Sequence, residues 1–152
     1  MAYWLMKTEP EAFSLDDLAE RGQEPWDGIR NYQARNFMRS MTPGDGVFIY
    51  HSRVLIPGIV GVADVRTSAH PDPTQFDSSC KYYDPNSKAE TPRWDLVDVG
   101  FRGRLTSVVS LDELRRMSVF SDSPLIRKGN RLSILPITEA QWTAVLERVE
   151  LV

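Results

Sequence analysis

Aromatic, amide and arginine side chains gather in two neighbouring segments of the chain. Residues 26–39 read WDGIRNYQARNFMR and residues 44–52 read GDGVFIYHS. Burial in an apolar core does not account for this mixture of side chains. Flat aromatic faces, planar amides and fixed cations are what a protein needs to stack on a heterocycle, read its edge and hold a phosphate. The two segments therefore favour recognition of a nucleotide more clearly than they favour any reaction.

Trp26 is the first candidate to stack on a base. It lies between Pro25 and Asp27, outside any helical or strand pattern of apolar residues, and the alternative is a place in the core. Tyr82 and Tyr83 lie in a polar stretch, where exposed paired tyrosines either pack or bind. We interpret them as a lid over a pocket or as packing beneath their loop, and both interpretations stay open.

Polar side chains of two kinds are candidates for the edge of such a base. Asn31 carries an amide donor and acceptor, although it is equally well placed to cap a helix. Tyr50 and Ser52 share one face of a predicted strand, with His51 on the other face. Ser133, just before the last predicted strand, adds a hydroxyl.

Arginines and lysines form a local positive region on an acidic chain. The net charge is −3, which argues against a protein that coats nucleic acid by charge alone. Residues 1–29 carry two cations against seven anions, whereas residues 30–66 carry five cations against two anions. We interpret the cations of residues 30–66 and of residues 127–131 as phosphate contacts or as part of a solvent-exposed face. This distribution suits a reader of one or two nucleotides.

The totals describe an ordinary globular protein. The chain has 152 residues, 41% hydrophobic and 26% charged, which fits one domain over residues 1–152. No apolar run approaches the roughly 20 residues of a membrane span, and the first residues do not resemble a signal peptide. Cys80 is the single cysteine, so an internal disulfide and a cysteine-rich zinc site are excluded. We expect a cytoplasmic protein, nuclear in a eukaryote, with no membrane partner.

Short strands and helices can be placed from capping residues and apolar spacing. Ser14 and Asp17 have the spacing of a capping box before a helix over residues 15–21, Asn31 caps a helix over 32–41, and Thr138 caps the last helix. Strands are predicted over residues 3–7, 47–51, 57–65, 94–101 and 132–135, with a brief helix capped by Ser110. Gly61 marks a bulge or a close approach. Residues 66–92 are predicted as a long, ordered functional loop.

These elements together predict a small α+β domain. Short strands separated by irregular loops, with helices at the margins, are typical of a mixed β barrel.

The chain resembles the EVE-domain family of the PUA-like superfamily, which is related to the YTH readers of methylated adenine. Several ordered motifs across nearly the whole chain carry the resemblance: YWLMKTEP (3–10), WDGIRNYQARNF (26–37), YHS (50–52), GIVG (58–61), TQF (74–76), YYDP (82–85), RW (93–94) and RLSILP (131–136).

The resemblance implies a PUA-like mixed β pseudo-barrel flanked by short helices, with an aromatic pocket for a modified nucleobase. C5-modified cytosine in DNA is the favoured ligand class. Trp26 then corresponds to a tryptophan of the YTH aromatic cage, and Lys7 to the lysine that closes the first strand. The candidate base-binding residues are Lys7, Thr8, Trp26, Asn31, Tyr50, Ser52, Tyr82, Tyr83, Trp94 and Ser133, and the candidate phosphate-binding residues are Arg30, Arg35, Arg127, Lys128 and Arg131.

Two functions of different classes follow. The first is a binding module that takes a flipped, modified base of DNA or RNA into the pocket, without catalytic residues, metal or cofactor, and that signals through an unidentified effector protein or by occupancy. The rival is an enzyme acting on a modified nucleotide or a small heterocycle, with His51 and Ser52 working beside Glu9 or Asp84. The chain has no nucleophile elbow, phosphate-cradling glycine loop or two-histidine metal motif, which favours the reader. A protein-interaction domain is the third possibility.

Overall fold

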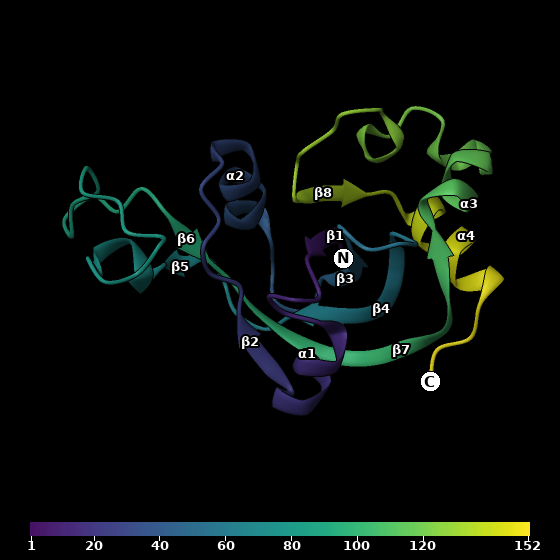
Figure 1. Ribbon diagram of the computed structural model, residues 1–152, viewed down its shortest axis with the longest axis horizontal. Coiled ribbons are helices and arrows are strands. Elements are labelled where there is room, and N and C mark those ends of the chain that lie inside the picture. Colours follow the sequence, from purple (N-terminus) through teal and green to yellow (C-terminus); the bar gives the residue numbers. More distant parts are fainter.

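A curled six-stranded sheet forms the centre of the molecule (Figure 1). The structure is a computed structural model that describes residues 1–152. The strand order is β2-β7-β4-β3-β1-β8; β1 and β3 are parallel, and all other neighbours are antiparallel. A two-stranded sheet of β5 and β6 lies beside it. The strands are β1 (Tyr3–Thr8), β2 (Gln23–Pro25), β3 (Gly46–His51), β4 (Gly58–Val65), β5 (His70–Pro71), β6 (Asp95–Leu96), β7 (Asp98–Ser110) and β8 (Ile134–Ile137).

Short helices pack against the sheet. Helices α1 and α2 belong to the first of two apolar clusters, while α3 and α4 belong to the second. In Figure 1 the segment with β5 and β6 extends away from the curled sheet, on the side opposite α3 and α4. The helices are α1 (Leu15–Arg21), α2 (Tyr32–Ser40), α3 (Leu111–Arg116) and α4 (Glu139–Arg148), with 3₁₀ turns η1 (Pro73–Phe76), η2 (Ser118–Phe120) and η3 (Pro124–Ile126).

Alternation along the central strands divides the core between the two clusters. In β1, Trp4 and Met6 belong to the first cluster and Leu5 to the second; in β3, Ile49 belongs to the first and Phe48 to the second. Successive side chains of a strand point to opposite faces, so both faces of the sheet are buried. The predicted mixed β pseudo-barrel flanked by short helices is confirmed.

The predicted helix starts are confirmed by their caps. The side chains of Ser14 and Asp17 form the reciprocal capping box of α1. The Asn31 side chain accepts the N–H of Ala34 at 2.9 Å, and α2 ends at Ser40, one residue before the predicted end. Thr138 forms a second capping box before α4. These bonds join residues three positions apart, which is why the sequence alone was enough to place them.

Gly61 lies at the predicted irregularity in β4. The pairing register of β4 with β7 shifts between Ile59 and Gly61, and a Cβ on Gly61 would lie 2.6 Å from the side chain of Leu15. Both readings of this glycine, the bulge and the close approach, are therefore correct.

Four elements differ from the sequence prediction. The strand predicted over residues 94–101 is divided between β6 and β7, and β7 continues to Ser110. The segment of β2 was expected to be a loop, because after Gly22 it consists of only two polar residues and a proline. It forms an edge strand by pairing with β7. The predicted long loop contains β5 and η1, organised around the fully buried side chains of Asp72 and Gln75. Finally, the last strand begins at Ile134 rather than at residue 132.

Candidate functional site

A cavity of about 670 Å³ opens where several elements of the first half of the chain meet. The end of β1, the loop that follows it and Arg21 at the end of α1 border one side, and the segment from β2 through Ile29 borders another. Residues 81–82 and Ser133 complete the wall from distant parts of the sequence. Small-molecule sites in proteins are commonly about 300–1,000 Å³, so the cavity has room for one nucleotide unit.

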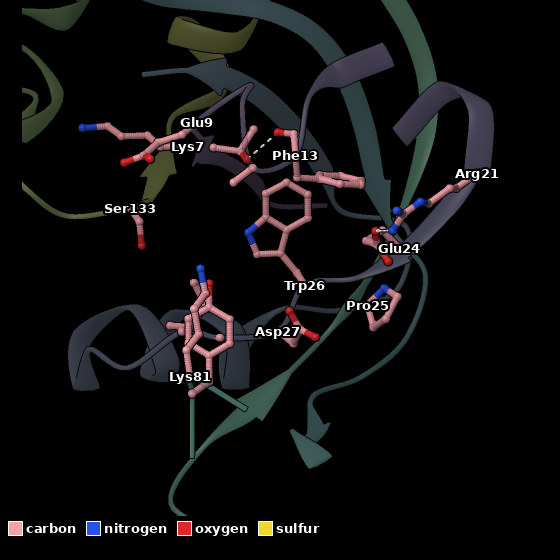
Figure 2. Close-up of a pocket in the computed structure, with 15 residues that line it drawn as sticks. Lys7, Glu9, Phe13, Arg21, Glu24, Pro25, Trp26, Asp27, Lys81 and Ser133 are labelled. Carbon is pink, nitrogen blue, oxygen red and sulfur yellow. Dashed lines mark hydrogen bonds and ion pairs between the residues drawn. The ribbon is translucent and has the colours of Figure 1, made fainter. Parts of the chain in front are cut away.

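Trp26 is at once a core residue and a wall of this cavity. Only 7% of the residue is exposed, and its ring packs into the first apolar cluster with the edge of Phe13 at a centroid distance of 5.8 Å and an interplanar angle of 86°. Its backbone N–H donates to Val97 at 2.9 Å. Figure 2 shows the indole nitrogen directed into the cavity, where it has no hydrogen-bond partner. The ring is therefore rigidly held, with an N–H donor left for a ligand.

Gly28 allows the cavity wall and the loop of Tyr82 to lie in direct contact. Its φ is +78°, and a Cβ at this position would lie 2.6 Å from the ring of Tyr82. Its N–H donates to Oδ2 of Asp72 at 2.9 Å. A residue other than glycine would be strained here and would displace the tyrosine.

The guanidinium of Arg30 ties the same loop to the cavity wall. It donates to the carbonyl of Tyr82 at 2.8 and 3.0 Å, to Thr74 Oγ1 at 3.0 Å and to Asp72 Oδ2 at 3.1 Å. Burial alone raises the pKa of Asp72, but hydrogen bonds from Thr74, Gly28 and Arg30 outweigh burial and keep the pKa below its ordinary value. Asp72 is thus a buried carboxylate, and its charge is satisfied on all sides.

Charged side chains around the cavity fall into paired and unpaired groups. Glu9 pairs with Arg53 at 2.9 Å, and Glu24 pairs with Arg21. The amines of Lys7 and Lys81 have no carboxylate partner; burial lowers the pKa of Lys7, whose Nζ lies 5.5 Å from the Tyr50 ring centroid. Both residues line the cavity, although the Lys7 amine is directed away from the indole (Figure 2).

Asp27 is the remaining charged group of the cavity, and it too lacks a hydrogen-bond or ion-pair partner among the side chains. Burial, followed by repulsion from Asp72 and Glu24, raises the pKa of Asp27, and Arg30 opposes this shift. An unpaired carboxylate beside an indole is a hydrogen-bond acceptor available to a ligand.

Five of the ten candidate base-binding residues lie around the cavity. They come from four separate parts of the chain, which the fold brings together. They are Lys7, Thr8, Trp26, Tyr82 and Ser133.

The other five candidates lie outside the cavity and have other contacts. Asn31 is the cap of α2, and Tyr50 is buried in the second apolar cluster. The N–H of Ser52 donates to the carbonyl of Thr8, which continues the pairing of β3 with β1. Trp94 is 6% exposed and stacks on Tyr32, while Tyr83 lies exposed on the surface. Alternation predicted the shared face of Tyr50 and Ser52 but not which cluster covers that face.

The candidate phosphate-binding residues also separate into two groups. Arg30 is fully engaged within the protein, and Arg35 donates to the carbonyl of Arg93 and to Asn36, so neither is a free cation. Three exposed cations make no ion pair and lie in the segment that leads to Ser133 of the cavity; they are Arg127, Lys128 and Arg131.

The residues considered for acid–base chemistry are not assembled. His51 Nε2 accepts the N–H of Leu15 at 3.1 Å, which makes the imidazole a cap of α1, and burial lowers its pKa. Asp84 accepts the indole N–H of Trp94 at 2.7 Å. No hydrogen bond joins His51 to Ser52, to Glu9 or to Asp84. The His51 imidazole therefore has a structural role at the start of α1.

Several residues of the cavity escaped the sequence interpretation, above all Phe13, Asp27 and Lys81. Lys81 and Asp27 stand next to Tyr82 and Trp26, so adjacency to a candidate aromatic was a usable signal. Phe13 had none, because it follows the first strand in a loop.

The structure contains neither a metal-binding cluster nor a helix suited to cross a membrane. No three histidine, cysteine, aspartate or glutamate side chains gather where they could hold a metal ion. None of the helices combines the length and apolar character that a membrane crossing requires.

Comparison with known proteins gives consistent matches over nearly the whole chain. The family model described as EVE domain matches residues 2–148. Thymocyte nuclear protein 1 of Mus musculus is 39% identical over 166 residues, covering 97% of this chain and 74% of that protein. The crystal structure of protein PSPTO5229 from Pseudomonas syringae superposes with a TM-score of 0.92 at 45% identity, covering 97% of this chain and 99% of the other. The crystal structure of human THYN1 in complex with 5-methylcytosine-containing DNA gives a TM-score of 0.88 at 38% identity, covering 97% of each chain.

Proposed function

Because the chain belongs to the EVE domain family, we propose that it is a nucleic-acid reader that takes a modified base, foremost C5-methylcytosine in DNA, into the cavity beside Trp26. The observation that carries the proposal is the Trp26 ring, fixed by the core on one side and bordering the cavity on the other. The related human protein crystallised with methylcytosine-containing DNA supports the ligand class.

A base enters such a cavity by leaving its stack. Stacking on an aromatic side chain contributes about 1–3 kcal/mol, which repays part of the cost of unstacking. Burying an added methyl group contributes about 0.8 kcal/mol, or roughly a fourfold preference over cytosine. The ring therefore contributes more binding free energy than the methyl group, which supplies a modest selectivity.

Cations around the cavity would meet the phosphates on either side of the base. Lys81 and Lys7 lie in the cavity itself, and Arg127, Lys128 and Arg131 lead to its rim at Ser133. Each phosphate contact with duplex DNA adds about 0.9 to the negative slope of log K against log salt concentration. The chain as a whole is acidic, with a net charge of −3, which limits this attraction to the cavity region.

The test uses short duplexes and single strands that carry one C5-methylcytosine or one cytosine at the same position. We expect tighter binding to the methylated strand and quenching of tryptophan fluorescence. Trp26→Phe should remove most of the quenching, and Trp26→Ala should weaken binding by about 5- to 150-fold, the equivalent of 1–3 kcal/mol. The matched control is Trp142→Phe, which changes a tryptophan stacked on Phe48 in the other cluster.

Two outcomes would refute the reader. One is equal binding to methylated and unmethylated DNA by the unaltered protein. The other is unchanged binding by Trp26→Ala once its fold has been verified by circular dichroism. Because Trp26 contributes to the core, thermal unfolding of each variant accompanies the titration.

A further inference from the structure

Thymine poses a problem for any reader of C5-methylcytosine. Both bases carry a methyl group at C5 of a pyrimidine ring, so shape and stacking alone accept either. They differ at C4, next to the methyl group, where cytosine presents an amino donor and thymine presents a carbonyl acceptor. Thymine is abundant in DNA, so a reader needs a hydrogen-bond acceptor that faces the amino group.

Three carboxylates border the cavity, and two of them are already paired. Glu9 is paired with Arg53 and Glu24 with Arg21. Asp27 has no such partner, and its residue directly follows Trp26. Figure 2 shows the carboxylate of Asp27 beside the indole, at the same side of the cavity.

We propose that Asp27 reads the amino group of the base that stacks on Trp26, so that the cavity selects a cytosine-type base over thymine or uracil. This inference rests on the proposed reader function. An ionised Asp27 accepts the amino N–H. A protonated Asp27 accepts the amino N–H and donates to the ring nitrogen, which gives two hydrogen bonds. Thymine would place its O4 carbonyl oxygen against the carboxylate instead, so at most its N3–H could donate to an ionised Asp27 and the contact at C4 would be repulsive.

The surroundings of Asp27 strengthen the case for a donor ligand. Partial burial, followed by repulsion from Asp72 and Glu24, raises the pKa of Asp27, while Arg30 and a hydrogen bond from the residue's own backbone oppose this shift. Because the residue is still exposed to solvent, its charge carries only a modest cost before a ligand binds. An N–H donor from a ligand relieves this cost, and a second carbonyl oxygen increases it.

The indole N–H of Trp26 completes a pair of opposite polarity. It is a donor without a partner, directed into the cavity next to the Asp27 acceptor. The indole N–H lies in the plane of its ring, so it cannot reach a base stacked on the face of that ring and is left for a sugar or phosphate oxygen, whereas the Asp27 carboxylate can meet the edge of the base. Discrimination therefore falls on Asp27.

The experiment measures the affinity ratio for C5-methylcytosine over thymine at one position, opposite the same guanine in the partner strand. A mismatched thymine leaves the duplex more easily, so this choice of partner strand works against the expected ratio. The unaltered protein should favour C5-methylcytosine by about 5- to 150-fold, the range for loss of a bidentate base contact of about 1–3 kcal/mol.

Asp27→Asn gives the decisive comparison. An amide can turn either its oxygen or its nitrogen to the base, so the ratio should fall to below about threefold while C5-methylcytosine still binds. Asp27→Ala should lose affinity for C5-methylcytosine and gain affinity for thymine, because the carboxylate that opposes the thymine carbonyl is removed. The matched control is Asp77→Asn, the same substitution at an exposed aspartate outside the cavity, which should keep the ratio of the unaltered protein.

The failures of the two proposals can be told apart. If the unaltered protein prefers methylated over unmethylated DNA but Asp27→Asn keeps the thymine ratio, Asp27 is not the reading residue and the reader function stands. If the unaltered protein shows no methylation preference, the reader function itself fails. Thermal unfolding of each Asp27 variant verifies the fold, and the exposed position of the residue favours a folded product.

Discussion

Replacing Asp72 by asparagine should separate the cavity wall from the loop that covers it. One carboxylate oxygen accepts the N–H of Thr74 at 2.8 Å and its hydroxyl at 2.6 Å. The other accepts the N–H of Gly28 at 2.9 Å and Nη1 of Arg30 at 3.1 Å. An asparagine keeps the first oxygen but turns an NH₂ group toward the two donors of the second.

The expected cost follows from these four bonds. Two hydrogen bonds to a charged acceptor are lost, and each contributes about 1.5–3 kcal/mol. Removing one partner of a buried ion pair costs about 3–5 kcal/mol, and Asp72 is fully buried while the Arg30 side chain is 21% exposed. We therefore expect Asp72→Asn to lower the free energy of unfolding by about 3–5 kcal/mol, with weaker DNA binding in the fraction that remains folded.

The assay is urea unfolding followed by circular dichroism at pH 7. Asp77→Asn is the matched control, because Asp77 accepts the N–H and hydroxyl of Ser79 at 2.9 and 2.6 Å in the same local pattern but lies at the surface. It should cost far less than Asp72→Asn. A loss below about 1 kcal/mol for Asp72→Asn, less than a single hydrogen bond to a charged group is worth, would refute the reasoning.

The pH dependence has a defined sign. Folding lowers the pKa of Asp72 below its ordinary value of 3.8, so its contribution to stability is present above that pH and is lost as pH falls. The difference between the unaltered protein and Asp72→Asn should therefore narrow in acid. A difference that stays constant from pH 7 to pH 3 would contradict a charged Asp72.

Three further variants test the other contacts. Gly28→Ala should lower the free energy of unfolding by about 1–2 kcal/mol, because its φ is +78°, and should displace Tyr82 and weaken DNA binding; unchanged binding would contradict the contact. His51→Ala should cost about 1 kcal/mol in urea unfolding at pH 8, because the N–H of Leu15 loses its acceptor. Burial lowers the pKa of His51 below 6.5, so this contribution is lost as pH falls through the folded pKa, and an equal cost at pH 5 would argue against it. Arg131→Gln should reduce the salt slope of DNA binding by about 1 without altering the methylation preference, and an altered preference would place Arg131 at the base instead.

Local interactions account for what the sequence could predict of the fold. The capping boxes at Ser14 and Thr138 and the cap at Asn31 depend on residues three positions apart. The strands follow from apolar runs and alternation. Strand β2 was missed because its hydrogen bonds come from β7, more than seventy residues away, and nothing in its own three residues favours a strand.

The candidate site was predictable only in part, for the same reason. Trp26 could be identified because an isolated tryptophan between polar residues lacks a local structural explanation. Asn31 was ambiguous, and the short-range cap turned out to occupy its side chain. Arg30 is separated from Asp72 by 42 positions, so its pairing was invisible and its free charge was overestimated. Asp27 was missed because its significance lies in the absence of a partner, which only the folded structure reveals.

A single buried carboxylate sets the spacing of the cavity on two sides. Asp72 accepts the N–H of Gly28, two residues after Trp26 on the wall, and it also orients Arg30. Arg30 in turn holds the carbonyl of Tyr82 on the covering loop. Both surfaces are therefore ordered before any base arrives, which reduces the entropy lost on binding. It follows that variants of this network should change stability and DNA affinity together, whereas variants of Asp27 should change the choice of base without destabilising the fold.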